Sequence, residues 1–243
     1  RGLSVIRCFS ASNPKLTLSE VARLAELTRA GARRILLTLQ TLGYVRLSGR
    51  DFSLTPKILD LGFAYLSSLP LWNLAEPAME SLVQTVKESS SAAVLDGLDI
   101  VYVLRIPTHK IMSINLGVGS RLPAWCTSMG RVLLAALSDE EITQALHASI
   151  IEAITPHTVT DYNALFAQIQ LVREQGWSLV DQELEVGLVS IAAPITDRNG
   201  STLAALNVSG QATRNSAQQM REQVLPELLK AAQGISRLLV IKA

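Results

Sequence analysis

Three arginines, Arg29, Arg33 and Arg34, stand within six residues at a spacing that puts them on one side of a helix. The apolar residues from Ala32 to Leu42 fall on the opposite side, so the helix would have one buried and one cationic face. Guanidinium groups pair with guanine edges and phosphates, and the first turns of a recognition helix face the bases. The pattern predicts a DNA-recognition helix whose contacts come from Thr28, Arg29, Ala30, Arg33 and Arg34.

The residues around this helix predict the frame that presents it. Apolar residues recur at helical spacing from Leu3 to Phe9, which predicts a first short helix. Thr17 and Glu20 fit a capping box that opens a second helix. Thr28 is an N-cap candidate for the third helix, and Gly43 is suited to end it.

A β-hairpin is predicted from Tyr44 to Leu54, where apolar and polar residues alternate on both sides of a turn. Arg46 and Arg50 lie in this hairpin and would contact phosphates or the minor groove. Three helices followed by such a hairpin make a winged helix-turn-helix over residues 1–56.

Charge is distributed very unevenly along the chain, although its net value is only +1. Residues 1–57 hold ten lysines and arginines against three acids, whereas residues 58–243 carry a net charge of −6. A basic head on an acidic body is typical of a protein that binds double-stranded DNA. The alternative that the charge leaves open is a ligand-binding module whose winged helix contacts another protein.

A second group of chemistry-bearing residues lies between Cys126 and Arg131, at the entry to another predicted helix. Hydroxyls and amides at the positive end of a helix can bind a carboxylate. Arg121 and Arg131 are candidate partners of the same carboxylate, and Trp125 and Met129 would supply apolar contacts. The group predicts a site for a small carboxylate.

The same segment raises the alternative of an enzyme that depends on Cys126, since the pKa of a thiol can fall at a helix start. His109, His147 and His157 are the available bases. The sequence has no nucleophile elbow, no glycine-rich phosphate loop and no metal-ligand spacing around these residues. We therefore expect no catalytic residue, no metal and no cofactor, and the enzyme is the least favoured alternative.

Composition fits a globular protein, with 48% hydrophobic residues in a chain of 243. No apolar run reaches the roughly 18 to 20 residues that span a membrane, and the first twelve residues lack a signal-peptide pattern. The two cysteines, Cys8 and Cys126, fall in different predicted domains, so we expect no disulfide and a cytoplasmic location.

Beyond the hairpin, hairpin-linked strands with helices over one face predict an α+β domain. The expected boundaries are a head over residues 1–56, a linker helix over 57–70 and an effector-binding domain over 71–243. Three further expectations are a strand at 111–116, a C-terminal helix interrupted at Pro226, and a helix whose inward face comprises Leu74, Ala78, Leu82 and Val86.

The sequence resembles the IclR-type bacterial transcription regulators along essentially its whole length. The run from Arg29 to Arg34 is most similar to the branch that regulates aromatic-acid catabolism through protocatechuate and β-ketoadipate. The stretches that carry the resemblance are Arg1–Ile6, Leu16–Ala22, Arg34–Leu39, Leu42–Val45, Leu122–Ala135 and Gly187–Ile195.

This resemblance implies a GAF-like antiparallel sheet domain and a small carboxylate effector such as protocatechuate or β-ketoadipate. Ser128 and Met129 stand where regulators of two- and three-carbon acids have smaller residues, and Val180 replaces an acid, which predicts a less polar wall. Glu183, at a strand end, is an additional candidate. The pocket residues implied by position are Thr127, Ser128, Met129, Ser190, Asn207 and Ser209.

The linker helix predicts self-association, because apolar residues such as Leu61 and Tyr65 occupy more than one of its faces. A single small head also makes few contacts for an operator, and two-fold proteins bind two-fold sites. We expect a homodimer, or a dimer of dimers, on a palindromic operator.

Overall fold

The computed structural model describes residues 1–68, 71–108 and 116–242. The chain divides into two compact units, Arg1–Leu69 and Pro70–Ala243, and each has its own hydrophobic core. No helix in the described part of the chain combines the length and apolar character that crossing a bilayer requires.

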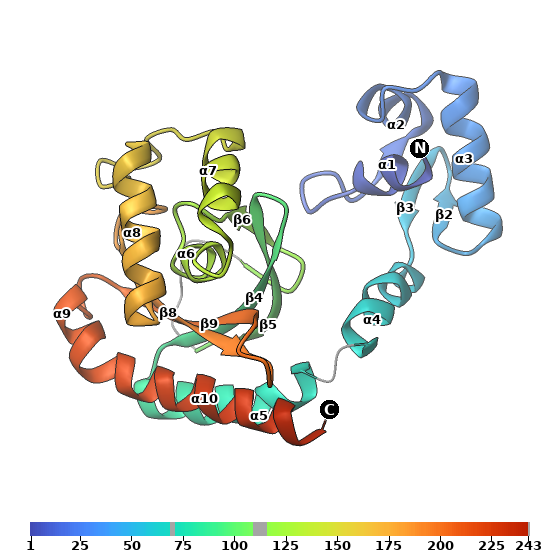
Figure 1. Ribbon diagram of the computed structural model, residues 1–243. Coiled ribbons are helices and arrows are strands. Elements are labelled where there is room, and N and C mark those ends of the chain that lie inside the picture. Colours follow the sequence, from blue (N-terminus) through green and yellow to red (C-terminus); the bar gives the residue numbers. More distant parts are fainter. Residues whose placement is uncertain (69–70, 109–115, 243) are drawn as a thin grey trace. The chain divides into compact units, whose positions relative to one another are not determined.

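The first unit packs three helices against a small antiparallel sheet in the order β1-β3-β2 (Figure 1). Val5, Val21, Leu36 and Phe52 are buried together in its core. The elements are α1 (Gly2–Arg7), β1 (Leu16–Thr17), α2 (Leu18–Leu24), α3 (Arg29–Thr41), β2 (Val45–Ser48) and β3 (Asp51–Leu54).

The helix starts in this unit are fixed by the caps that the sequence predicts. The Glu20 carboxylate accepts from the Thr17 amide at 2.7 Å, and the Thr17 hydroxyl accepts from the Glu20 amide, which completes the capping box. The Thr28 hydroxyl accepts from the Gly31 amide at 3.1 Å and so caps α3. Gly43 follows α3 with a φ of 82°, a conformation that favours glycine.

Two details of the unit differ from expectation. Leu42 does not extend the buried stripe of α3, because it is the C-cap residue beyond the last helical turn and is 52% exposed. The β1 strand was not predicted, since two residues are too few to show alternation, yet β1 pairs with β3.

A 3₁₀ turn, η1 (Pro56–Ile58), and helix α4 (Leu59–Ser68) follow the hairpin. Lys57 ties η1 to the end of α3, because its Nζ donates to the Leu42 carbonyl at 2.9 Å and lies 5.2 Å from the centre of the Tyr44 ring. Leu59 and Phe63 of α4 are 70% and 69% exposed, so this helix carries uncovered apolar surface within the chain.

The second unit is built on a six-stranded antiparallel sheet in the order β6-β5-β4-β9-β8-β7. The sheet curls, so that one of its faces is concave (Figure 1). Its strands are β4 (Ser89–Asp96), β5 (Asp99–Ile106), β6 (Arg121–Pro123), β7 (Ser178–Asp181), β8 (Leu188–Thr196) and β9 (Thr202–Gln211).

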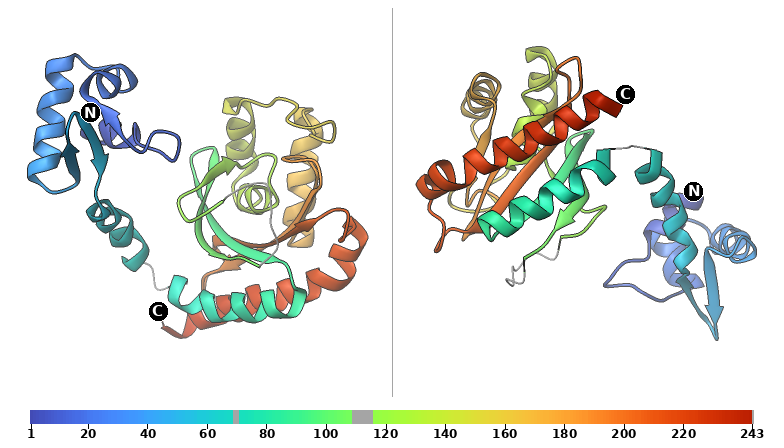
Figure 2. Two further views of the ribbon diagram at one scale, coloured as in Figure 1. Left: turned by 180° about the vertical axis from the view of Figure 1, so that it is seen from behind. Right: turned by 90° about the horizontal axis from the view of Figure 1, so that it is seen from below.

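Helices cover both faces of this sheet, and the expectation of helices on one face was wrong. α5 and α10 lie side by side against one face, and α6 packs into the concave face beneath α7 and α8 (Figures 1 and 2). The physical reason lies in β8, where successive residues from 189 to 193 are buried, so both sides of the strand need cover. The helices are α5 (Leu71–Val86), α6 (Ser128–Leu134), α7 (Asp139–Ala148), α8 (Tyr162–Gln175), α9 (Ala217–Gln219) and α10 (Leu225–Lys242).

Several local expectations for this unit need revision. In α5, Leu82 is buried as predicted, whereas Leu74, Ala78 and Val86 are half-buried, and Ala75, Met79 and Val83 complete the buried face. The C-terminal helix is not interrupted at Pro226, because the π turn η2 (Met220–Val224) comes just before it and accommodates a residue without an N–H. β6 was not predicted, and the expected strand at 111–116 lies almost wholly outside the described residues.

Candidate functional site

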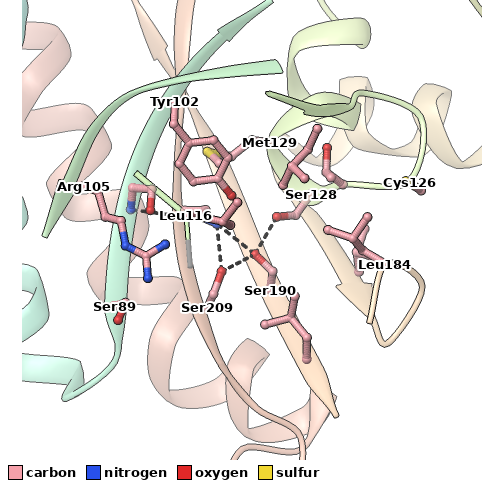
Figure 3. A pocket seen from close by; sticks show the side chains of 16 residues that line it. Ser89, Tyr102, Arg105, Leu116, Cys126, Ser128, Met129, Leu184, Ser190 and Ser209 are labelled. Atoms are coloured by element: carbon pink, nitrogen blue, oxygen red, sulfur yellow. Dashed lines mark hydrogen bonds between the residues drawn. The ribbon is translucent and has the colours of Figure 1, made fainter. Parts of the chain in front are cut away.

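A cavity lies on the concave face of the second unit, between the sheet and the start of α6 (Figure 3). It holds about 600 Å³ of space between its lining atoms, including the part that opens to solvent. The lining residues are Ser89, Ser91, Tyr102, Arg105, Leu116, Leu122, Cys126, Thr127, Ser128, Met129, Val180, Leu184, Leu188, Ser190, Asn207 and Ser209.

One wall of the cavity is a connected network of hydroxyl and amide groups (Figure 3). The Ser190 hydroxyl lies 2.8 Å from that of Ser128 and 2.9 Å from that of Ser209. The Asn207 amide donates to Ser190 at 3.0 Å and to Ser209 at 2.9 Å. Its oxygen accepts from the Ser91 amide at 2.9 Å, which fixes the orientation of the side chain.

Strand register brings this network together. Ser190 and Ser209 are direct partners on β8 and β9, and Ser91 is the partner of Asn207 on β4 and β9. Ser128 reaches the same point from the first turn of α6. A hydroxyl that already takes part in this network can still accept a hydrogen bond from a bound molecule, because each hydroxyl has two acceptor lone pairs.

Much of the remaining lining is apolar and includes Tyr102, Leu116, Met129 and Leu184. Burial of the phenol raises the pKa of Tyr102 to about 12, so its hydroxyl is a neutral donor at physiological pH. An apolar chamber with a few convergent polar groups is the usual form of a small-molecule site.

Arg105 is the cation among the described lining residues, and it was not predicted from the sequence. The half-buried side chain projects from β5 into the chamber (Figure 3), and within the described ranges no ion pair or hydrogen bond of its guanidinium is recorded. The signal was available in the sequence, because Arg105 is the one charged residue in the otherwise apolar run from Ile100 to Ile106.

The structure brings six of the predicted pocket residues into the cavity lining: Thr127, Ser128, Met129, Ser190, Asn207 and Ser209. It does not bring Arg121 there, since that guanidinium pairs on the surface with Asp96 at 2.6 Å and Asp99 at 3.1 Å. Trp125 is buried in the core, next to the lining and not part of it.

Arg131 and Glu183, also predicted as effector contacts, lie outside the lining and bind each other. Two parallel hydrogen bonds of 2.8 and 2.7 Å join the guanidinium to the carboxylate, and both side chains are almost fully buried. Arg131 Nε also donates to the Trp125 carbonyl at 3.0 Å. This pairing leaves Arg105 as the cation among the described lining residues.

The loop before α6 is held tightly against the helix. Gly130 is required there, because a Cβ at this position would lie 2.0 Å from the Ala124 carbonyl oxygen. The Thr127 hydroxyl accepts from the Gly130 amide at 3.2 Å and donates to the Pro123 carbonyl at 3.0 Å. Burial raises the pKa of the Cys126 thiol to about 12, so it stays protonated and lacks the thiolate that a nucleophile needs.

On the first unit, all seven residues predicted to contact DNA are exposed: Thr28, Arg29, Ala30, Arg33, Arg34, Arg46 and Arg50. No salt bridge joins these arginines to an acid within the described part of the chain. Arg46 is partly engaged, because its Nε donates to the Ser53 hydroxyl across the hairpin at 3.1 Å.

A basic winged helix-turn-helix joined to a domain with a small-molecule chamber defines a ligand-responsive transcription regulator. Family comparison agrees: residues 1–49 match the IclR helix-turn-helix domain, and residues 63–237 match the bacterial transcriptional regulator IclR C-terminal domain. The chain therefore belongs to the IclR family. It is a DNA-binding transcription regulator with an effector-binding domain, not an enzyme.

Individual relatives agree with this assignment. The chain is 46% identical to the Pca regulon regulatory protein of Pseudomonas putida over 97% of its own length and 81% of the relative's. A crystal structure of a protein described as a transcriptional regulator from Rhodococcus sp. RHA1 superposes with a TM-score of 0.89 at 49% identity, covering 98% and 96% of the two chains. An IclR homologue from Microbacterium hydrocarbonoxydans, crystallised with 4-hydroxybenzoate, gives 0.85 at 26% identity, covering 98% and 97%.

Proposed function

We propose that this regulator responds to a small aromatic carboxylate bound in the cavity, with the carboxylate on Arg105. The observation that carries the proposal is a guanidinium that has no ion pair with any described residue and lies on the same sheet face as the hydroxyl and amide network, in a largely apolar chamber. A guanidinium binds a carboxylate through two parallel hydrogen bonds. The start of α6, where the sequence analysis placed the carboxylate, is less suited, because Thr127 already caps this seven-residue helix.

The other end of the effector would meet the serines. In this orientation the ring packs against Tyr102, Leu116 and Met129, and ring hydroxyls reach Ser190 and Ser209. Protocatechuate has one carboxylate and two hydroxyls, which match the two ends of the chamber. β-Ketoadipate would place its second carboxylate against neutral groups, so protocatechuate is the better match. The 4-hydroxybenzoate complex of the Microbacterium homologue supports an aromatic acid.

Calorimetric titration of the full chain with protocatechuate, 4-hydroxybenzoate and β-ketoadipate tests this proposal. Replacement of Arg105 by Gln should weaken binding of the aromatic acid by about 1.5–3 kcal/mol, the range for a hydrogen bond to a charged group. Arg121→Gln is the matched control, since Arg121 pairs with Asp96 and Asp99 outside the cavity. Equal binding to both variants would place the carboxylate elsewhere.

For the head, we propose that α3 enters the major groove with Thr28, Arg29, Ala30, Arg33 and Arg34 toward the DNA, and that Arg46 and Arg50 contact its backbone. Exposure, together with the lack of salt bridges to any described residue, supports these roles, because an exposed guanidinium can bind a phosphate or a base. The domain roles that follow are DNA binding for residues 1–56, linkage for 57–70 and effector binding for 71–243.

We further propose a homodimer, able to pair again, that binds a palindromic operator through two heads. The exposed Leu59 and Phe63 lie one turn apart on α4, and the exposed Leu61 lies on another face; apolar surface of this kind supports a dimer, because a second copy of the helix can cover it. Replacement of Leu59 and Phe63 by Glu should shift the sedimenting species toward monomer and weaken operator binding. A wild-type chain that stays monomeric at micromolar concentration while binding its operator at full affinity would refute the dimer.

A further inference from the structure

The buried pair of Arg131 and Glu183 connects three segments that are far apart in sequence. Arg131 belongs to α6 and holds the Trp125 carbonyl, immediately before the lining residue Cys126. Glu183 belongs to the turn between β7 and β8, and its Oε2 also accepts from the Val159 amide at 3.2 Å. The pair thus joins one wall of the cavity, the loop before α8 and the β7–β8 turn.

The β7–β8 turn, residues 182–187, carries part of the cavity lining. Leu184 follows Glu183 directly and lies in the chamber wall (Figure 3), as does Leu188 at the end of the turn. Further bonds brace the turn from below: the Thr155 hydroxyl donates to the Gln182 carbonyl at 2.6 Å, and that of Thr158 donates to the Glu183 carbonyl at 2.7 Å. The position of Leu184 therefore depends on where Glu183 is held.

We propose that Arg131 and Glu183 are positioning residues that hold the β7–β8 turn against α6 as a wall of the effector cavity. This inference rests on the proposed effector site and explains how the shape of that site is maintained. Neither side chain touches the chamber, so the pair acts through Leu184 and through the loop that ends at Cys126.

Energetics explain why a positioning role suits this pair. Two buried charges gain about as much from each other as they lose by leaving water, and apolar residues of similar volume often replace them without loss of stability. A bidentate guanidinium–carboxylate pair differs from an apolar contact in direction, because its two parallel bonds fix both distance and orientation. This bidentate pair therefore fixes the position of the β7–β8 turn more narrowly than apolar packing would.

The test compares the wild-type chain with a double variant, Arg131→Met with Glu183→Leu, which removes both charges together. The variant should fold cooperatively and bind protocatechuate about tenfold more weakly, mainly through faster dissociation, within the range for residues that act through a network. Without effector, amide exchange should accelerate in residues 182–188 and 155–159. Arg121→Met is the matched control, because it breaks an exposed ion pair outside the cavity, and it should change neither quantity.

Unchanged amide exchange in the two segments would by itself overturn the positioning role. The exchange measurement needs no effector, so it judges the role even if neither protocatechuate nor β-ketoadipate binds the wild-type chain, an outcome that would defeat the effector proposal alone. Arg131→Lys serves if the double variant does not fold. This variant keeps the positive charge and loses the bidentate hydrogen bonds. It should accelerate effector dissociation and amide exchange, each by less than the double variant does.

Discussion

The arginines of the two units differ in their exposure and in their partners. In the head, Arg33 and Arg34 stand in solvent on α3 without salt bridges in the described part of the chain. In the second unit, Arg131 is 2% exposed and donates hydrogen bonds to Glu183 and to the Trp125 carbonyl. Exposed charge is free to replace counterions on a polyanion, whereas buried charge acts through geometry.

The largest effect expected from this contrast is on stability. Replacement of Arg131 by Ala leaves the Glu183 carboxylate buried without its partner, which should lower the free energy of unfolding by about 3–5 kcal/mol. Urea denaturation followed by far-UV circular dichroism measures the loss in both variants, because both units contain helices. The head variant Arg33→Ala should stay within about 0.5 kcal/mol of the wild-type protein. Similar losses of unfolding free energy in Arg131→Ala and Arg33→Ala would contradict the contrast between buried and exposed arginines.

DNA binding should show the reverse order. Arg33→Ala should weaken binding to the operator by about 1–3 kcal/mol and relax its sequence preference, if Arg33 reads a base edge. Arg50→Ala should weaken binding to all duplexes alike and reduce the salt dependence. Fluorescence anisotropy titrations at several salt concentrations separate the two effects. Full operator affinity in both variants would contradict the assignment of α3 and the hairpin to DNA.

The two thiols extend the comparison to pH. Burial raises the pKa of Cys126 from 9.0 to about 12, and that of the half-buried Cys8 rises as well. Above pH 9 the unfolded chain releases the Cys126 proton while the folded chain keeps it, so stability is complete below pH 9 and falls as the pH rises toward 12. The fall attributable to Cys126 is at most about 1.4 kcal/mol per pH unit.

Urea denaturation between pH 8 and 11, followed by tryptophan fluorescence, measures this loss, because Trp72, Trp125 and Trp177 all lie beyond the head. The Cys126→Ala variant should lose less stability than the wild-type protein over the alkaline range, because the shifted thiol is gone. Cys8→Ala is the control in the head and should leave the tryptophan-detected transition of the body unchanged. An alkaline loss of equal size in Cys126→Ala and the wild-type protein would assign it to other groups, Tyr102 first among them.

Local structure was predictable where a particular residue type caps a helix or adopts a backbone conformation that other residues disfavour. Thr17 with Glu20, Thr28 and the glycine after α3 all cap helices as the sequence indicates. The serines and the asparagine of the chamber were named by resemblance and lie together in one network. Whether they bind the effector stays a prediction.

The sequence by itself determined the class of protein, the basic head, the helix caps and the polar positions of the body, because these follow from residue type and short-range spacing. Only the tertiary structure decided which charges are free. Arg105, Arg121 and Arg131 are alike in the sequence, yet one faces the chamber, one pairs on the surface and one is buried with Glu183. Pairing over 22 to 52 positions depends on strand register and helix packing, which local patterns do not encode.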